Sequence, residues 1–90
     1  MNEAELRLDG NAAAGLLREV FAVEMTTAQG TCAHCGSTNA IGAVWVYVHA
    51  PGTVLRCPDC TAILMTIVRA RERLLVDLAG VRRLQLSAPD

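Results

Sequence analysis

The sequence contains no lysine, and all eight of its basic side chains are arginines. Only 19 % of its 90 residues are charged, and the formal net charge at pH 7 is −1. Because nucleic-acid binding depends on clustered positive charge, this balance lacks the electrostatic signature of a bulk nucleic-acid binder. With so many Ala, Val and Leu residues, an arginine-only set is typical of a GC-rich genome, and we draw no functional conclusion from it.

Long apolar runs are also missing. The longest, Ala62–Val68, is interrupted by Thr66, whereas a membrane-spanning helix needs about 20 residues. Residues 1–10 contain Glu3, Glu5 and Asp9 in place of the basic start and apolar stretch of a signal peptide. We therefore expect no membrane association and a cytoplasmic location, where thiols are kept reduced.

Disorder is excluded by what the chain does contain, because 52 % of its residues are hydrophobic. This content predicts a dense core or an apolar contact between copies of the chain. A domain of this size buries only about 60–65 % of its unfolded surface. Domains this small often need an additional stabilising cross-link, such as a structural metal.

All four cysteines fall into two CxxC pairs, Cys32-Ala-His-Cys35 and Cys57-Pro-Asp-Cys60, with 21 residues between them. This spacing is close to a pattern typical of zinc sites. Four thiolates form the tetrahedral sulfur shell that zinc accepts in structural sites. We predict a structural Zn²⁺ site with Cys32, Cys35, Cys57 and Cys60 as ligands. Such a site contributes on the order of 10 kcal/mol of apparent binding energy to the folded state.

The residues around each pair are suited to tight turns, or knuckles. Gly36 can adopt a positive φ, and Pro58 pre-sets φ within the second pair. Thr61 stands where a second glycine would be usual. We expect His34 to be exposed, with a role as a substitute ligand as the alternative. Arg56 either offsets the negative charge of the site or is simply a solvated surface residue.

An enzymatic role is not expected. Four cysteines fill the zinc shell and leave no coordination position for an activated water. Ser37, Ser87 and the two histidines show no grouping of the catalytic-triad kind. The second pair alone is similar to a thioredoxin redox motif, but the chain has two pairs and no βαβ pattern. We infer neither a catalytic residue nor a small-molecule substrate.

The chain is expected to form a lead over residues 1–9, one domain over 10–86 and a tail over 87–90. An apolar stripe at helical spacing predicts a helix over residues 10–23, capped by Asp9 or Asn11. The stripe consists of Ala13, Leu16, Leu17, Val20 and Phe21. A short strand is expected over 24–28, followed by a turn at 29–30.

Strict alternation over residues 43–49 predicts a strand with Val44, Val46 and Val48 on one face. Its other face carries Trp45, Tyr47 and His49, which either pack beneath the helix or form a ligand surface. A turn at 50–52 leads to a strand over 53–56. A strand buried on both faces is expected over 61–68, and further strands over 74–78 and 81–86. A helix over 70–79 is the rival interpretation.

The sequence therefore predicts a small α+β fold, in which an N-terminal helix packs on an antiparallel zinc-ribbon sheet of about four to five strands. Residues 8–86, through the segments Leu8–Val23, Cys32–Gly36, Tyr47–Cys60 and Val76–Leu86, resemble a family of short actinobacterial proteins. That family is a domain of unknown function with a zinc-ribbon appearance. The resemblance implies strands in the C-terminal segment and no activity. The four cysteines match the family's presumed ligands one for one.

These observations predict a small zinc-ribbon protein with a structural metal and a role in binding. We expect its partner to be another protein or a second copy of the chain. One alternative is a ribbon associated with nucleic acid or transcription, using the aromatic strand together with Arg69, Arg71 and Arg73. Another is a thiol sensor that releases zinc when it is oxidised.

Overall fold

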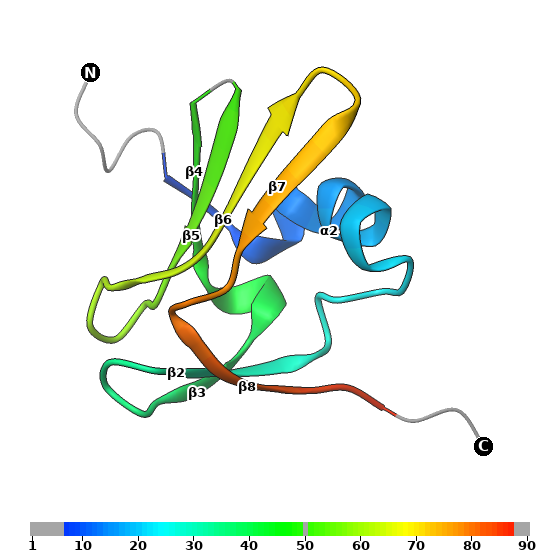
Figure 1. Cartoon of the computed structure of the whole chain (residues 1–90). Coiled ribbons are helices and arrows are strands. Elements are labelled where there is room, and N and C mark those ends of the chain that lie inside the picture. Colours follow the sequence, from blue (N-terminus) through cyan, green and yellow to red (C-terminus); the bar gives the residue numbers. More distant parts are fainter. Residues whose placement is uncertain (1–6, 50, 88–90) are drawn as a thin grey trace.

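The computed structural model describes residues 7–49 and 51–87 and shows a small α+β fold with two antiparallel sheets (Figure 1). The helix predicted over 10–23 is present as a 3₁₀ turn, η1 (Gly10–Ala13), followed by α2 (Ala14–Phe21). It ends earlier than predicted because Ala22 turns into the left-handed region at φ 58°. Asp9 precedes the 3₁₀ turn, but its side chain makes no capping hydrogen bond.

The larger sheet has five strands in the order β1-β4-β5-β6-β7. Their bounds are Arg7–Asp9 for β1, Trp45–His49 for β4, Gly52–Arg56 for β5, Ile63–Ala70 for β6 and Arg73–Asp77 for β7. Strand β1 pairs with β4 and takes in the last three residues of the predicted lead. Residues 1–6, Ala50 of the predicted turn and tail residues 88–90 lie outside the described part of the chain.

The C-terminal strands are confirmed, and the helix considered for residues 70–79 is not formed. Strands β6 and β7 are joined by a two-residue turn at Arg71 and Glu72, with Ala70 opposite Arg73. Arg71 makes this turn without glycine by adopting a φ of 57°. Strand β6 departs from the prediction of burial on both faces, because Met65 and Ile67 are each 1 % exposed on one face whereas Thr66 and Val68 on the other face are only half-buried.

The smaller sheet has three strands in the order β3-β2-β8. Its members are β2 (Gln29–Cys32), β3 (Thr38–Ala40) and β8 (Val81–Gln85). The small α+β fold and an antiparallel sheet of five strands agree with the prediction, whereas the second, three-stranded sheet in the described part of the chain was not predicted. In Figure 1 the small sheet lies below the large one.

The strand predicted over residues 24–28 and the turn at 29–30 are wrong. Residues 24–28 form a loop whose apolar side chains fill the core: Met25 is 1 % exposed and Ala28 is 4 % exposed. The carbonyls of Thr26 and Ala28 accept hydrogen bonds of 2.9 Å each from the backbone of η2 (Ile41–Ala43). This loop therefore satisfies its backbone through η2 rather than through a strand partner.

The hydrophobic core lies between α2 and one face of the large sheet. Leu17 of α2 and Val46 of β4 are both completely buried in one cluster. Because side chains alternate along a strand, Trp45 and Tyr47 are on the opposite face. The interpretation that the aromatic residues pack beneath the helix is therefore wrong. Tyr47 is buried, Trp45 is half-buried and His49 is exposed on that opposite face.

In the described residues, no helix has the length and apolar character needed to cross a membrane.

Candidate metal centre

The two CxxC pairs form backbone turns with the same hydrogen-bond pattern. The N–H of Cys32 donates to the carbonyl of Ser37 at 2.8 Å, and the N–H of Cys57 donates to that of Ala62 at 2.9 Å. Within each turn, the residue after the second cysteine donates back to the first cysteine, at 3.0 Å in the first knuckle and 2.8 Å in the second. Strands β2 and β5 therefore end in equivalent turns, although β2 belongs to the small sheet and β5 to the large one.

The residues after the two pairs adopt the same backbone conformation. Gly36 has a φ of 80° and Thr61 has a φ of 66°. This region is readily available to glycine and unfavourable for a β-branched residue. The Thr61 hydroxyl donates to the carbonyl of Cys60 at 2.5 Å. The second knuckle is thus built with threonine where the first uses glycine.

The four sulfur atoms lie close together at the meeting point of the knuckles. The Sγ atoms of Cys32 and Cys60 are 3.7 Å apart, as are those of Cys35 and Cys57, and all four lie within 4.8 Å of one another. A tetrahedron with Zn–S bonds of about 2.3 Å has edges of about 3.8 Å. Disulfide sulfurs are about 2.05 Å apart, and all four cysteines are free. The donor set and its spacing therefore fit a metal ion.

Backbone amides surround the sulfurs. The N–H of His34 donates to the Sγ of Cys32 at 3.4 Å. Cys35 accepts from Ser37, and Cys60 accepts from the backbone of Ala62. Cys57 accepts from the backbone at positions 59 and 60. Such donors stabilise thiolates that carry more negative charge than one divalent ion cancels.

The surroundings of the thiols pull their pKa values apart. Hydrogen bonds from the side chain and backbone of Ser37 lower the pKa of Cys35 to about 6. Burial raises the pKa of Cys57. The Ala62 amide favours the Cys60 thiolate, but burial and the neighbouring thiols outweigh it and raise the pKa to about 12. Four thiolates at this separation repel one another, so the cluster needs a cation to ionise fully.

The cluster is partly built into the core. Cys32 and Cys57 are 1 % and 0 % exposed and belong to the same buried cluster as Leu17. Cys35 is exposed and Cys60 is partly exposed. His34 is exposed, as predicted, and within the described residues the metal-competent group consists of the four cysteines alone.

Contacts that the sequence did not reveal connect the knuckles to the rest of the fold. The N–H of Ala33 donates to the carbonyl of Gly80 at 2.9 Å. Gly80 lies against β6, and a Cβ atom added to it would be 1.8 Å from the carbonyl oxygen of Ile63. The amide of Asn39 donates to Asp59 at 2.9 Å. Gly80, which lies between the strands expected over 74–78 and 81–86, was the one available signal, and nothing in the sequence indicated which segment it would contact.

Arg56 has a structural role that neither sequence interpretation described. Its guanidinium donates to the carbonyl of Thr61 at 2.9 Å and lies 5.8 Å from the centre of the Tyr47 ring. The side chain therefore connects the second knuckle to the aromatic face of the sheet.

A family of unknown function, DUF6510, matches the chain over residues 2–89. Comparisons with the curated proteins and with the solved structures gave no match.

Proposed function

We propose that this chain, which belongs to the DUF6510 family, is a zinc-ribbon protein that binds one structural Zn²⁺ through Cys32, Cys35, Cys57 and Cys60. The observation that carries this proposal is the pair of 3.7 Å sulfur separations, one for each pairing between the two knuckles. Zinc takes an all-sulfur tetrahedral shell in structural sites. The bound ion would supply the positive charge that the crowded thiolates require.

A structural role is supported over a catalytic one by the number and burial of the ligands. Four thiolates complete the shell of a zinc ion and leave no position for a reacting water. Cys32 and Cys57 are buried among apolar core side chains. The metal would thus stabilise the junction between the two sheets, and we propose no enzymatic activity.

We further propose that the protein acts in the cytoplasm as a protein-interaction module. The support is an apolar groove at the edge of the large sheet, where Leu75 of β7 is 54 % exposed beside its pairing partner Val68. Exposed apolar side chains that gather on a sheet are typical of contact surfaces.

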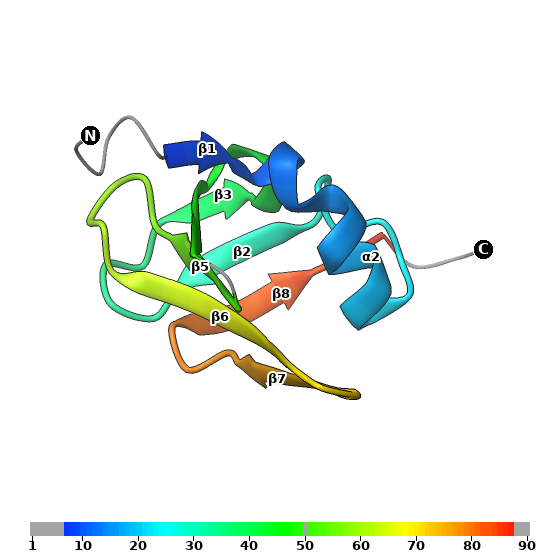
Figure 2. The same cartoon turned by 90° about the horizontal axis from the view of Figure 1, so that it is seen from above.

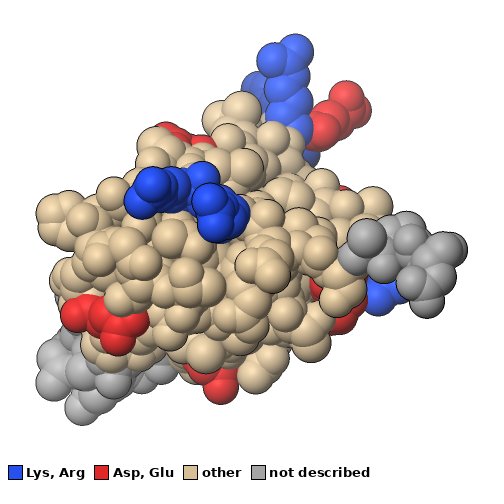
Figure 3. Space-filling model, turned by 90° about the horizontal axis from the view of Figure 1, so that it is seen from below, with Lys and Arg blue, Asp and Glu red and all other residues tan. Residues whose placement is uncertain are grey.

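The nucleic-acid alternative gains little support. Arg69 is paired with Glu19 at 2.8 Å, so one of the three candidate arginines already has an acidic partner. Seen from below, the surface is mostly uncharged, and its charged side chains stand in small separate groups (Figure 3). Such a surface does not present a continuous basic track for a phosphate backbone.

A thiol sensor is the second candidate function, and the exposure of Cys35 favours it. An oxidant can reach this sulfur while Cys32 and Cys57 remain buried. Treatment with dilute peroxide should then release zinc rapidly, and a reductant should restore binding. Zinc that is retained under these conditions would identify the site as purely structural.

Elemental analysis combined with native mass spectrometry tests the main proposal. We expect one zinc per chain and four thiols that react with a thiol reagent only after chelation. Cys57→Ser should lose the metal, whereas Ser87→Ala, a change outside the knuckles, should keep it. A content well below one metal per chain, with four freely reactive thiols, would overturn the proposal.

A further inference from the structure

Strand β7 is an open edge of the large sheet. It pairs with β6 on one side, and among the described residues no strand pairs with its other side. Figure 2 shows β7 at the margin of the molecule. An open edge presents unpaired backbone groups to any strand that can align with it.

The backbone groups at this edge can be assigned from the hydrogen bonds of β6. The N–H of Arg69 donates to the carbonyl of Pro51, on the β5 side. Because successive residues of a strand direct their backbone N–H and C=O groups to opposite sides, those of Val68 point to β7. The backbone groups of its partner Leu75 therefore point back to β6. Leu74 and Val76, the residues on either side of Leu75, therefore direct their N–H and C=O groups to the open edge.

The sequence of β7 is complementary to itself when two copies run antiparallel. Placing a two-fold axis at Leu75 aligns all five residues, with Arg73 opposite Asp77 of the other copy on both sides of the axis. Leu74 then lies opposite the second copy's Val76, so the outward-facing residues meet each other and can exchange four hydrogen bonds. Moving the axis to a neighbouring residue shortens the overlap and separates the charges.

The side chains required for this pairing are accessible. Arg73 is exposed and makes no hydrogen bond or ion pair within the described residues. Asp77 is exposed and uses one carboxylate oxygen to accept from the N–H of Ala79 at 2.8 Å, which leaves its second oxygen available. Like charges would not approach in this register, whereas Arg–Asp pairs attract across strands.

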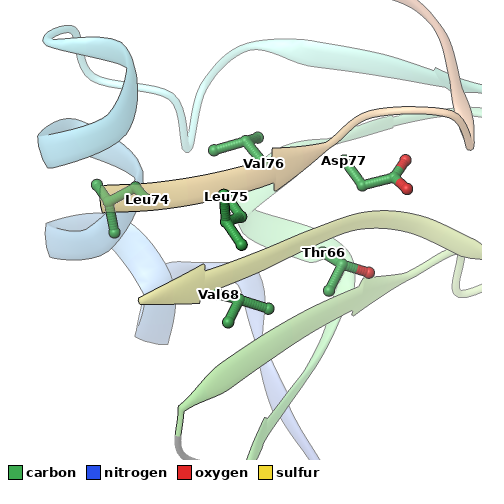
Figure 4. A pocket seen from close by; sticks show the side chains of 6 residues that line it. All are labelled: Thr66, Val68, Leu74, Leu75, Val76 and Asp77. Atoms are coloured by element: carbon green, nitrogen blue, oxygen red, sulfur yellow. The ribbon is translucent and has the colours of Figure 1, made fainter. Parts of the chain in front are cut away.

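An apolar groove accompanies the edge. It has a volume of about 510 Å³ and is lined by Thr66, Val68, Leu74, Leu75, Val76 and Asp77. Figure 4 shows Leu75 lying over β6 near Val68. In a two-fold pair, Leu75 would meet the same residue of the other copy at the axis. The two grooves would then join into one apolar strip.

From these observations we propose that the binding partner of β7 is a second copy of this chain, and that the two β7 strands join the large sheets into one continuous antiparallel sheet. This deepens the proposed protein-interaction function by naming the partner. The assembly is isologous, because each copy offers the same edge to the other.

Sedimentation equilibrium of the zinc-loaded protein across micromolar concentrations tests the proposal. We expect a reversible dimer, and Arg73→Asp should raise the dissociation constant by about 10- to 100-fold because two attractive pairs become repulsive. Asp77→Arg should do the same. An equimolar mixture of these two variants should recover the dimer, because each acidic edge then faces a basic one.

Two further variants distinguish loss of the dimer contact from a general disturbance of folding. Leu75→Lys places like charges at the axis and should abolish the dimer. Val48→Lys, at an equally exposed residue of the interior strand β4, should leave it intact. The amides of Leu74 and Val76 should exchange with solvent faster on dilution, whereas that of Leu75 should not change.

A monomer at every concentration would overturn the proposal, as would a dimer unaffected by Leu75→Lys or by the charge reversals. Zinc content is measured separately on each variant. One zinc per chain in a strict monomer would reject the dimer and leave the metal site standing. A dimer without zinc would reject the metal site instead.

Discussion

We expect Thr61→Gly to stabilise the protein, because Thr61 is held at a φ of 66° in a knuckle whose counterpart uses glycine at 80°. The left-handed conformation costs a residue with a Cβ atom about 1–2 kcal/mol. Glycine gives back about 0.5–1 kcal/mol through the greater entropy of its unfolded chain. The net gain is therefore about 0.5–1 kcal/mol, equivalent to a rise in Tm of about 2–8 °C for a domain of this size.

Thermal unfolding followed by circular dichroism, in excess zinc, measures this change. Gly36→Ala is the matched control in the first knuckle. A Cβ atom at Gly36 would meet no neighbouring atom within 4 Å, so any loss of stability in Gly36→Ala comes from the backbone conformation alone. We expect that loss to be about 1 kcal/mol. Thr61→Ala separates the two features of threonine, because it removes the hydroxyl that donates to Cys60 and keeps the Cβ atom. A fall in Tm for Thr61→Gly would refute the reasoning and show that the threonine side chain stabilises the knuckle.

Cys57→Ser should abolish zinc binding and cooperative unfolding, because apparent zinc affinities of about 10–16 kcal/mol match or exceed the stability of a small domain; calorimetry with and without a chelator checks this. Gly80→Ala should prevent folding at 37 °C, because the new Cβ atom would lie 1.8 Å from the Ile63 carbonyl oxygen; a native near-ultraviolet circular dichroism spectrum would contradict it. The hydrogen bond from Arg69 lowers the pKa of Glu19, so this pair stabilises the fold above the ordinary glutamate pKa and loses its effect as the pH falls through the lowered value. The difference in Tm between wild type and Glu19→Gln should therefore be small at pH 7 and vanish in acid, and a difference that grows in acid would contradict it.

The predictable parts of the fold were those with a pattern in consecutive residues. Alternation over 43–49 identified β4, and the cysteine spacing identified the four sulfurs that the structure brings together. The strand interpretation of residues 70–79 succeeded even though no turn former was present. Arg71 accepts the left-handed conformation there because the strands on both sides are paired.

The remaining elements depend on partners distant in the sequence. The described part of strand β1 has three residues, too few to show a period, and pairs with β4. Strand β2 reads Gln-Gly-Thr-Cys, without apolar alternation, and lies between β3 and β8. Strand β4 has apolar side chains on both faces, so its sequence could not indicate which face α2 covers. Contacts with residues distant in the sequence therefore determine where β1 and β2 form and which face of β4 is covered by α2.

Strand β8 completes the small sheet by pairing with β2, so that Gln29 lies opposite Gln85. A growing chain on the ribosome therefore contains all four cysteines before it contains β8. The strands of the β4–β7 meander pair with neighbours in the chain and can assemble early, whereas β2 can pair early with β3 on one side only and must wait for β8 on the other. Metal capture can thus precede closure of the small sheet, and the zinc ion, rather than a strand, would be the first link between the two halves of the molecule.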